Sequence, residues 1–172
     1  MFHASQVHTR QPRWHRRPFF PASLAVLGCM LALGSNLSVG HEYQVGTLKI
    51  ERPWSRATPP GASVGAGYMI ITNSGKDDHL VSVSSPVAER VELHSSRLEG
   101  GVMKMRKLEQ LNIPSGGAVR FEPGALHLML VGLKQPLVEG TTVPLTLRFR
   151  SAGELTIQLK VEAIGAQGKS AH

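Results

Sequence analysis

The feature that most limits the fold of this chain is the regular spacing of its turn-forming residues. After Gly40, clusters of Gly, Pro, Asn and Ser interrupt the sequence roughly every eight to twelve residues. The runs between them either alternate polar and apolar residues, as in residues 90–94, or are apolar and β-branched, as in residues 68–72. No segment shows the 3.6-residue periodicity of a long amphipathic helix. The pattern predicts an all-β, single-domain fold of about eight or nine short strands, arranged as an antiparallel β-sandwich or barrel.

The expected strands are short and separated by recognisable turns. They cover residues 47–51, 68–72, 80–83, 90–94, 102–107, 118–121, 126–133, 143–150 and 154–161. The last two are joined through Ser151, Ala152 and Gly153, which predicts a hairpin.

The first forty residues have the order of a secretory signal rather than of a folded segment. They contain four arginines and no acidic residue, then an apolar run over residues 19–34, then the small residues Ser38-Val39-Gly40. We expect a signal peptide over residues 1–40, a domain over 41–164 and a flexible C-terminal tail over 165–172. Because the apolar run is shorter than the ~20 residues of a membrane-spanning helix, we expect no stable membrane insertion after signal removal.

Loss of this leader changes both the charge and the cysteine content. Fifteen Lys and Arg residues then face twelve Asp and Glu residues, which leaves a net charge of +3. With no basic block in the remainder, nucleic acid is not expected as a partner. The only cysteine, Cys29, lies in the leader, so the exported chain would have no disulfide and no thiolate ligand.

Histidines and methionines recur on strand faces that are not needed for the core. His127 and Met129 are two residues apart on an expected strand, so they share one face. The leucines that alternate with them take the opposite face. By the same alternation Glu92 and His94 point outward, and Met103 and Met105 share a face, although a single methionine on a strand is more often core filler.

These donor types together favour a soft metal ion. Thioether sulfur and imidazole nitrogen suit Cu(I). They are poor ligands for Mg²⁺ and Ca²⁺, which bind oxygen, and methionine is not a usual zinc ligand.

The spacing of these residues resembles a known family. Ten residues separate His94 from Met105, and twenty-one residues separate Met105 from the segment His127-Leu128-Met129. This spacing is similar to the signature of the periplasmic copper chaperones called PCu(A)C. The resemblance extends over roughly residues 42–162. It implies a cupredoxin-like β-sandwich in the periplasm. It also implies one Cu(I) per chain, bound by His94, Met105, His127 and Met129.

The resemblance further implies delivery of copper to assembly factors or a subunit of cytochrome c oxidase. One position departs from some members, which carry methionine directly after the first histidine, whereas this chain has Ser95. Met103 is therefore either a substitute ligand or a spectator, and we favour the spectator.

The sequence contains no nucleophile elbow, no Gly-rich phosphate loop, no recognisable pair of catalytic carboxylates and no Ser-His-Asp or Cys-His arrangement. We therefore expect a carrier and not an enzyme. A blue-copper electron carrier would need a cysteine thiolate. The remaining alternative is a copper enzyme or Cu(II)-binding protein that uses His41 as its N-terminal residue. Outside the ligand set, we expect Trp54 to pack in the core and the segment 77–79, Asp-Asp-His, to form a solvated turn.

Overall fold

The computed structural model describes residues 42–168, which form eleven β-strands. The strands are β1 (Glu42–Val45), β2 (Leu48–Arg56), β3 (Val64–Asn73), β4 (Asp78–Ser84), β5 (Ala88–Glu99), β6 (Val102–Leu108), β7 (Leu111–Ile113), β8 (Ala118–Phe121), β9 (Leu126–Leu133), β10 (Thr142–Phe149) and β11 (Gly153–Glu162). The expected signal peptide and His41 lie outside the described residues, as do the last four residues of the expected tail. The described part contains no helix long and apolar enough to cross a membrane.

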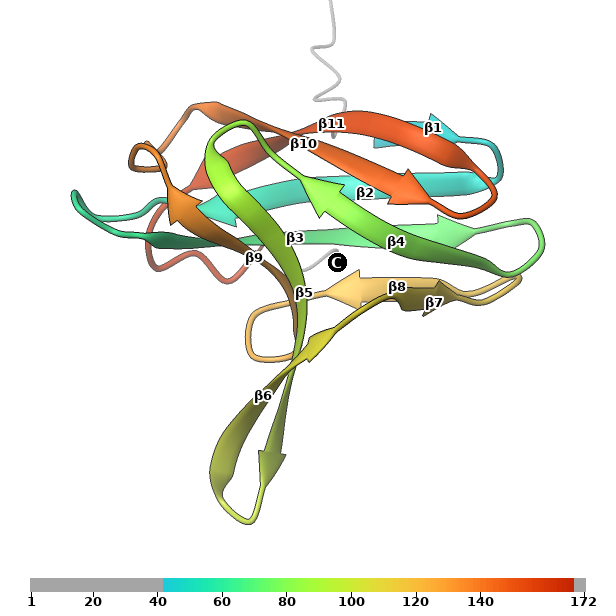
Figure 1. The fold of residues 1–172 in the computed structure, drawn as a ribbon, viewed down its shortest axis with the longest axis horizontal. Helices are drawn as coiled ribbons and strands as arrows, with labels where there is room; N and C mark the ends of the chain where they lie inside the picture. The colour runs from blue at the N-terminus through green and yellow to red at the C-terminus, as the bar shows by residue number, and fades with distance from the viewer. Residues whose placement is uncertain (1–41, 169–172) are drawn as a thin grey trace, which may run out of the picture. The chain divides into compact units, whose positions relative to one another are not determined.

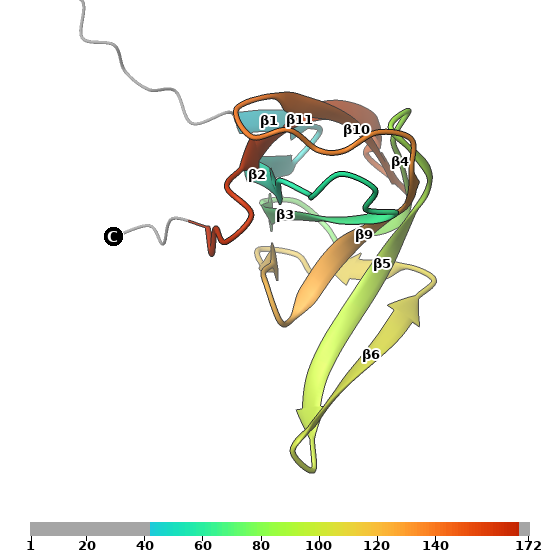
Figure 2. The same cartoon turned by 90° about the vertical axis from the view of Figure 1, so that its left-hand side faces the viewer.

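The strands form one hydrogen-bonded ladder in the order β6-β5-β9-β3-β2-β11-β10-β4-β7, with β1 on β2 and β8 on β3. All pairs are antiparallel except β2 with β11. Figures 1 and 2 show how the ladder folds back on itself, so that one face of each major strand points inward. This agrees with the predicted all-β sandwich.

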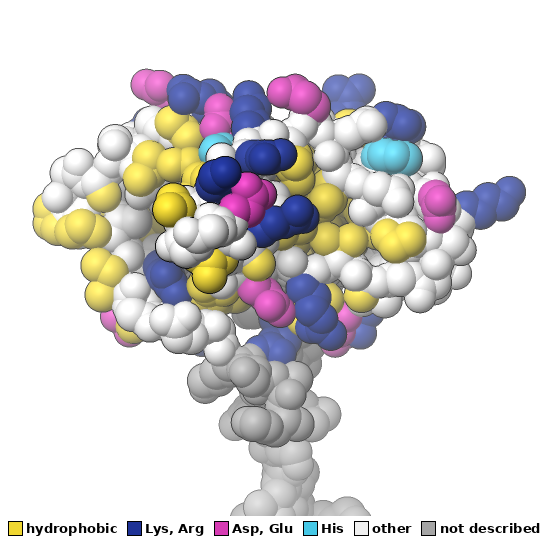
Figure 3. Space-filling model, turned by 90° about the horizontal axis from the view of Figure 1, so that it is seen from below, with side chains coloured by type: hydrophobic (Ala, Val, Ile, Leu, Met, Phe, Trp, Pro, Cys, Tyr) yellow, Lys and Arg dark blue, Asp and Glu magenta, His cyan; other side chains and the backbone are white. Residues whose placement is uncertain are grey.

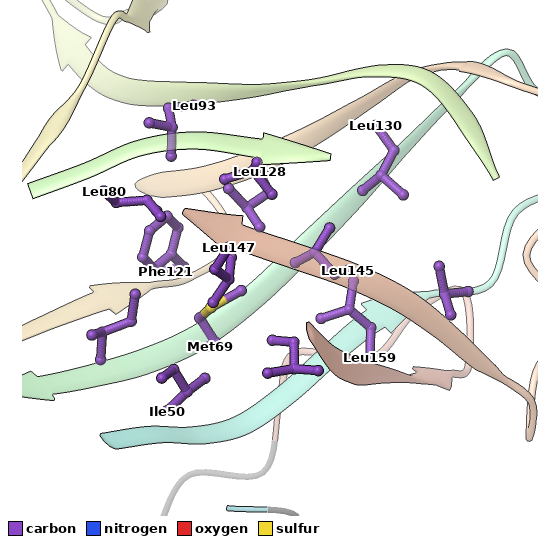
Figure 4. Packing of buried hydrophobic residues seen from close by; sticks show 14 of the residues in the cluster. Ile50, Met69, Leu80, Leu93, Phe121, Leu128, Leu130, Leu145, Leu147 and Leu159 are labelled. Atoms are coloured by element: carbon purple, nitrogen blue, oxygen red, sulfur yellow. The ribbon is translucent and has the colours of Figure 1, made fainter. Parts of the chain in front are cut away.

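The core fills the space between the folded halves of the ladder. Its fully buried side chains are aliphatic or aromatic and come from strands far apart in the sequence, among them Ile50, Met69, Phe121, Leu128 and Leu145. Figure 4 shows Met69 packed among these side chains, so its thioether fills core space. Alternation along β9 directs Leu128 and Leu130 into this core and leaves the neighbouring side chains on the outer face.

A hairpin made of β5 and β6 extends beyond the rest of the ladder (Figures 1 and 2). β5 pairs with β9 only as far as Ser95, whereas it pairs with β6 from Leu93 to Glu99. The outer half of the hairpin is therefore two-stranded. Gly100 and Gly101 make its turn with φ values of 59° and 81°, which glycine adopts without steric cost.

All nine expected strands are present, and β8 and β9 have the predicted bounds. β2 continues past Pro53 to Arg56, because a bulge between Glu51 and Trp54 takes Pro53 out of the regular ladder. Arg52 adopts φ 51° at this bulge. The sequence did not indicate β1 and β7, which are short strands at the margins of the ladder.

Candidate metal centre

Two histidines face each other across neighbouring strands. In the antiparallel pairing of β5 and β9, His94 lies directly opposite His127. Paired residues project to the same side of a sheet, and the two imidazole rings have centroids 5.8 Å apart with planes inclined by 42°. The structure therefore brings together the two histidines that the sequence singled out.

The two candidate methionine ligands, Met105 and Met129, lie on either side of this histidine pair. Met129 is opposite Glu92, two residues along β5 from His94 in one direction. Met105 is opposite Ser96, two residues from His94 in the other direction and on the other neighbouring strand. Met129 is half-buried, whereas Met105 is 52% exposed. All four candidate donors thus lie on one face, with the two methionines at opposite corners.

This corner arrangement sets a geometric condition for a single-ion site. In a flat ladder the Cα atoms of Met105 and Met129 would be on the order of 16 Å apart, given about 3.3 Å per residue and 4.8 Å per strand. Two thioethers around one ion do not span that distance. A single-ion site that includes both methionines therefore requires the β5–β6 hairpin to depart from a flat sheet.

His127 has one nitrogen engaged by the backbone. Its Nδ1 lies 2.9 Å from the carbonyl oxygen of Ala125. A carbonyl only accepts, so Nδ1 carries the proton and Nε2 keeps its lone pair. His127 is buried yet presents that free nitrogen, as metal-binding histidines do.

His94 has the opposite arrangement. Its Nε2 lies 2.9 Å from Oε2 of Glu92. The hydrogen bond to His94, followed by that to Arg90, lowers the pKa of Glu92 to about 2. The carboxylate is thus ionised at neutral pH and accepts the Nε2 proton.

The other nitrogen of His94 has no hydrogen-bond partner among residues 42–168. Nδ1 is buried there and unpaired, a situation that costs about 1–3 kcal/mol for a polar atom. A soft cation bound at Nδ1 would give this nitrogen a partner, and the donor set of two imidazoles and two thioethers suits Cu(I). The residues present therefore fit a copper ion. No group of three or more His, Cys, Asp or Glu side chains is placed to hold a metal between residues 42 and 168.

Met103 lies farther out on the same face as Met105. It pairs with Leu98 near the hairpin turn and is 54% exposed. Its position is two residues farther from the histidines than that of Met105. Figure 3, which views the side to which the hairpin points, shows hydrophobic side chains beside Lys and Arg side chains.

The expectation of a solvated turn at residues 77–79 was wrong for Asp78. This side chain is buried and accepts hydrogen bonds from the backbone N–H groups of His79, Ser151 and Ala152. Its carboxylate is needed to join the start of β4 to the β10–β11 turn. Asp77 is exposed and accepts a hydrogen bond from the Ser115 N–H.

Trp54 is buried, as expected, but on the outer face of β2. Its ring contacts that of Tyr68, with centroids 4.5 Å apart. Arg56 donates to the carbonyl oxygen of Ala166, which places the first residues of the expected tail against this part of the ladder. The prediction of a loose tail remains untested for residues 169–172.

Glu92 is the functional candidate that sequence reasoning left without a role. The period of two already placed it on the face of His94. Its contact with a ring nitrogen depends on side-chain conformations that the pattern does not specify.

Comparisons with known proteins identify a family and several relatives of this chain. The LpqE-like family model matches residues 48–161. A Leifsonia xyli protein described as a lipoprotein, Lxx21020, is 27% identical over 140 residues, which cover 81% of this chain and 83% of that protein.

Solved structures are similar as well. A copper-bound PCuAC domain from PmoF2 is 34% identical, with a TM-score of 0.63, over 72% of this chain and 98% of that domain. The solution structure of CuI-DR1885 from Deinococcus radiodurans is 28% identical, with a TM-score of 0.57, over 77% of this chain and 87% of that protein.

Proposed function

Because this chain belongs to the PCu(A)C family, we propose that it is a copper chaperone that carries Cu(I) and hands it to other proteins. It binds one ion per chain, and the proposed ligands are His94, Met105, His127 and Met129. The observation that carries this proposal is the opposed histidine pair, in which the buried Nδ1 of His94 has no partner in the described part of the chain. Thioethers on the same face supply the soft donors that Cu(I) prefers.

The cellular role follows from the leader and the relatives. A basic segment followed by an apolar run directs export, and one relative is described as a lipoprotein. We therefore place the protein in the periplasm or at the cell envelope. Its proposed acceptors are assembly factors or a subunit of cytochrome c oxidase.

The proposal is for a carrier and not for an enzyme. Four protein donors fill the coordination of Cu(I) and leave no open position for a substrate. Half exposure of Met105 gives an acceptor access to the ion from the hairpin side. Replacement of this outermost ligand by a donor of the acceptor is then the natural first step of transfer.

The test is a competition titration of Cu(I) against a chromophoric chelator under reducing conditions. Met105→Leu and Met129→Leu retain much of the side-chain volume but remove the sulfur. We expect each to lower Cu(I) affinity at least about tenfold, which corresponds to about 1.4 kcal/mol.

Met103→Leu is the matched control. Met103 lies on the same strand and face as Met105 and is similarly exposed to solvent, but it lies farther from the histidines. This variant should hold Cu(I) nearly as well as the parent. Unchanged affinity in both Met105→Leu and Met129→Leu would show that the four-ligand site is wrong.

A further inference from the structure

We propose that Glu92 is a positioning residue of the copper site, which fixes the ring of His94 so that Nδ1 and not Nε2 binds the ion. This inference rests on the proposed function, and it assigns a role to a residue outside the ligand set. It also predicts that the two histidines bind through different nitrogens.

The carboxylate of Glu92 is itself held in one orientation. Its Oε1 lies 3.1 Å from Nε of Arg90 and 3.5 Å from Nζ of Lys107. These two cations engage one oxygen and leave Oε2 for Nε2 of His94 at 2.9 Å. The side chains of Glu92 and His94 are only 16% and 12% exposed, so water competes little for this contact.

The contact decides which nitrogen of His94 carries a lone pair. A hydrogen bond from Nε2–H to a carboxylate leaves Nδ1 unprotonated in the neutral ring. That nitrogen is the buried atom without a partner. A carboxylate behind a metal-binding imidazole fixes both the tautomer and the ring orientation.

His127 is fixed by a different device and with the opposite outcome. The carbonyl of Ala125 accepts its Nδ1–H, so that only Nε2 remains free. Nδ1 is bonded to the ring carbon that joins the side chain, and it lies closer to the backbone than Nε2 does. An ion shared by Nδ1 of His94 and Nε2 of His127 therefore lies nearer to β5 than to β9. This position shortens the reach to Met105, because β6 pairs with β5.

Glu92 is not expected to bind the ion. Cu(I) prefers sulfur and nitrogen donors to carboxylate oxygen. Both oxygens of Glu92 are already paired with cationic or N–H groups of the protein.

The experiment uses protein with ¹⁵N-labelled histidine and Ag(I) as the probe. Both silver isotopes are magnetic nuclei, so a silver–nitrogen coupling identifies the bound ring nitrogen directly. In the parent protein we expect this coupling at Nδ1 of His94 and at Nε2 of His127.

Two substitutions of Glu92 separate positioning from packing. Glu92→Gln keeps an oxygen that accepts the Nε2 proton, so binding through Nδ1 should persist with a loss of only a few-fold in affinity. Glu92→Leu keeps the bulk but removes the acceptor. Its affinity should fall about 10–100-fold, the usual range for loss of such a partner, and the coupling at His94 should move to Nε2 or divide between both nitrogens.

Glu99→Gln is the control for loss of a negative charge on the same hairpin, because Glu99 forms its ion pairs with Lys104 and Arg106. It should leave the coupling pattern unchanged, and circular dichroism should show all variants folded. Coupling at Nε2 of His94 in the parent, or a Glu92→Leu variant with unchanged coupling and affinity, overturns the role of Glu92. Absence of coupling at both histidines contradicts the proposed ligand set instead.

Discussion

Among single residues, Asp78 shows how backbone groups alone can stabilise a buried charge. It is 4% exposed, and its two oxygens accept three backbone N–H groups at 2.7–2.9 Å. Burial alone would raise the pKa of Asp78, but the hydrogen bonds from Ser151, His79 and Ala152 outweigh it and lower the pKa below its usual value. The folded state therefore stabilises the ionised form of the Asp78 carboxylate.

This residue gives a prediction about stability and pH. Asp78→Asn replaces one accepting oxygen by a donor that faces an N–H group, so we expect a loss of about 1–3 kcal/mol in the free energy of unfolding at pH 7. Because the folded pKa is depressed, the contribution of Asp78 is complete above its unfolded pKa of about 3.9. It is lost as the pH falls further, through the folded pKa.

Urea unfolding at pH 7, 5 and 3 measures this effect. The difference between the parent and Asp78→Asn should be largest at pH 7 and 5 and smaller at pH 3. Asp77→Asn is the control, because that carboxylate is exposed and makes one hydrogen bond to Ser115. A difference that does not change with pH would contradict the assigned charge state.

Sequence alone predicted the strand faces of the candidate residues better than their cross-strand partners. Alternation along β9 correctly placed His127 away from Leu128 and Leu130, which are in the core. The period of two says nothing about which residue lies opposite on the next strand, since register depends on turns and on the whole hydrophobic pattern. The pairing of His94 with His127, and the contact of His94 with Glu92, therefore required the structure.

At the scale of elements, the β5–β6 hairpin has two chemically different faces. The register places Leu98, Met103 and Met105 on the face of His94, and Arg97, Lys104 and Arg106 on the other. Beyond Ser95 neither strand has another neighbour in the ladder. Isolated two-stranded hairpins are only marginally stable in water, so the outer half depends on local pairing and on whatever binds Met105.

We predict that copper binding slows hydrogen exchange in this outer half. Once Met105 is attached to the ion, residues 97–104 should open less often. Their amides should exchange about tenfold more slowly, which corresponds to about 1.4 kcal/mol. Exchange measured by NMR with and without Cu(I) provides the comparison.

Met105→Leu supplies the control for this prediction, since it leaves both histidines but detaches the hairpin from the ion. The copper-dependent protection of residues 97–104 should disappear in this variant, while amides in β5 and β9 near the histidines still respond. Equal protection in the parent and in Met105→Leu would show that Met105 does not couple the hairpin to the metal.

The two strands that were not predicted from the sequence are those with the weakest local sequence pattern. β1 and β7 have four and three residues, and each exists because a longer strand offers it hydrogen bonds. Longer strands such as β9 carry enough alternation to be recognised from the sequence. Short marginal strands depend on tertiary pairing, which local patterns do not encode.

At the scale of the whole described domain, the core and the proposed ligands occupy different faces of the strands. The core residues come from both halves of the folded ladder and contain no candidate ligand. Folding should therefore not require copper, in contrast to small domains whose structure depends on a metal.

We predict a folded apo-protein that copper stabilises without remodelling. Far-UV circular dichroism should show β structure before metal is added and little change afterwards. The thermal midpoint should rise, because an ion that binds only the native state adds about 2.7 kcal/mol when its free concentration is 100 times Kd. A disordered apo-protein that gains structure only with Cu(I) would contradict the separation of core and site.

The position of Met105 on β6, at one end of the ladder, has a consequence for how this site can change over generations. A substitution there alters the ion's surroundings but removes nothing from the interior, so it carries little risk to folding. His127 lies between core leucines on a central strand, where neighbouring packing restricts what can replace it. Natural variation and laboratory selection should therefore change the metal preference first through substitutions in the hairpin. The same fold can then come to bind a different metal ion after only a few mutations.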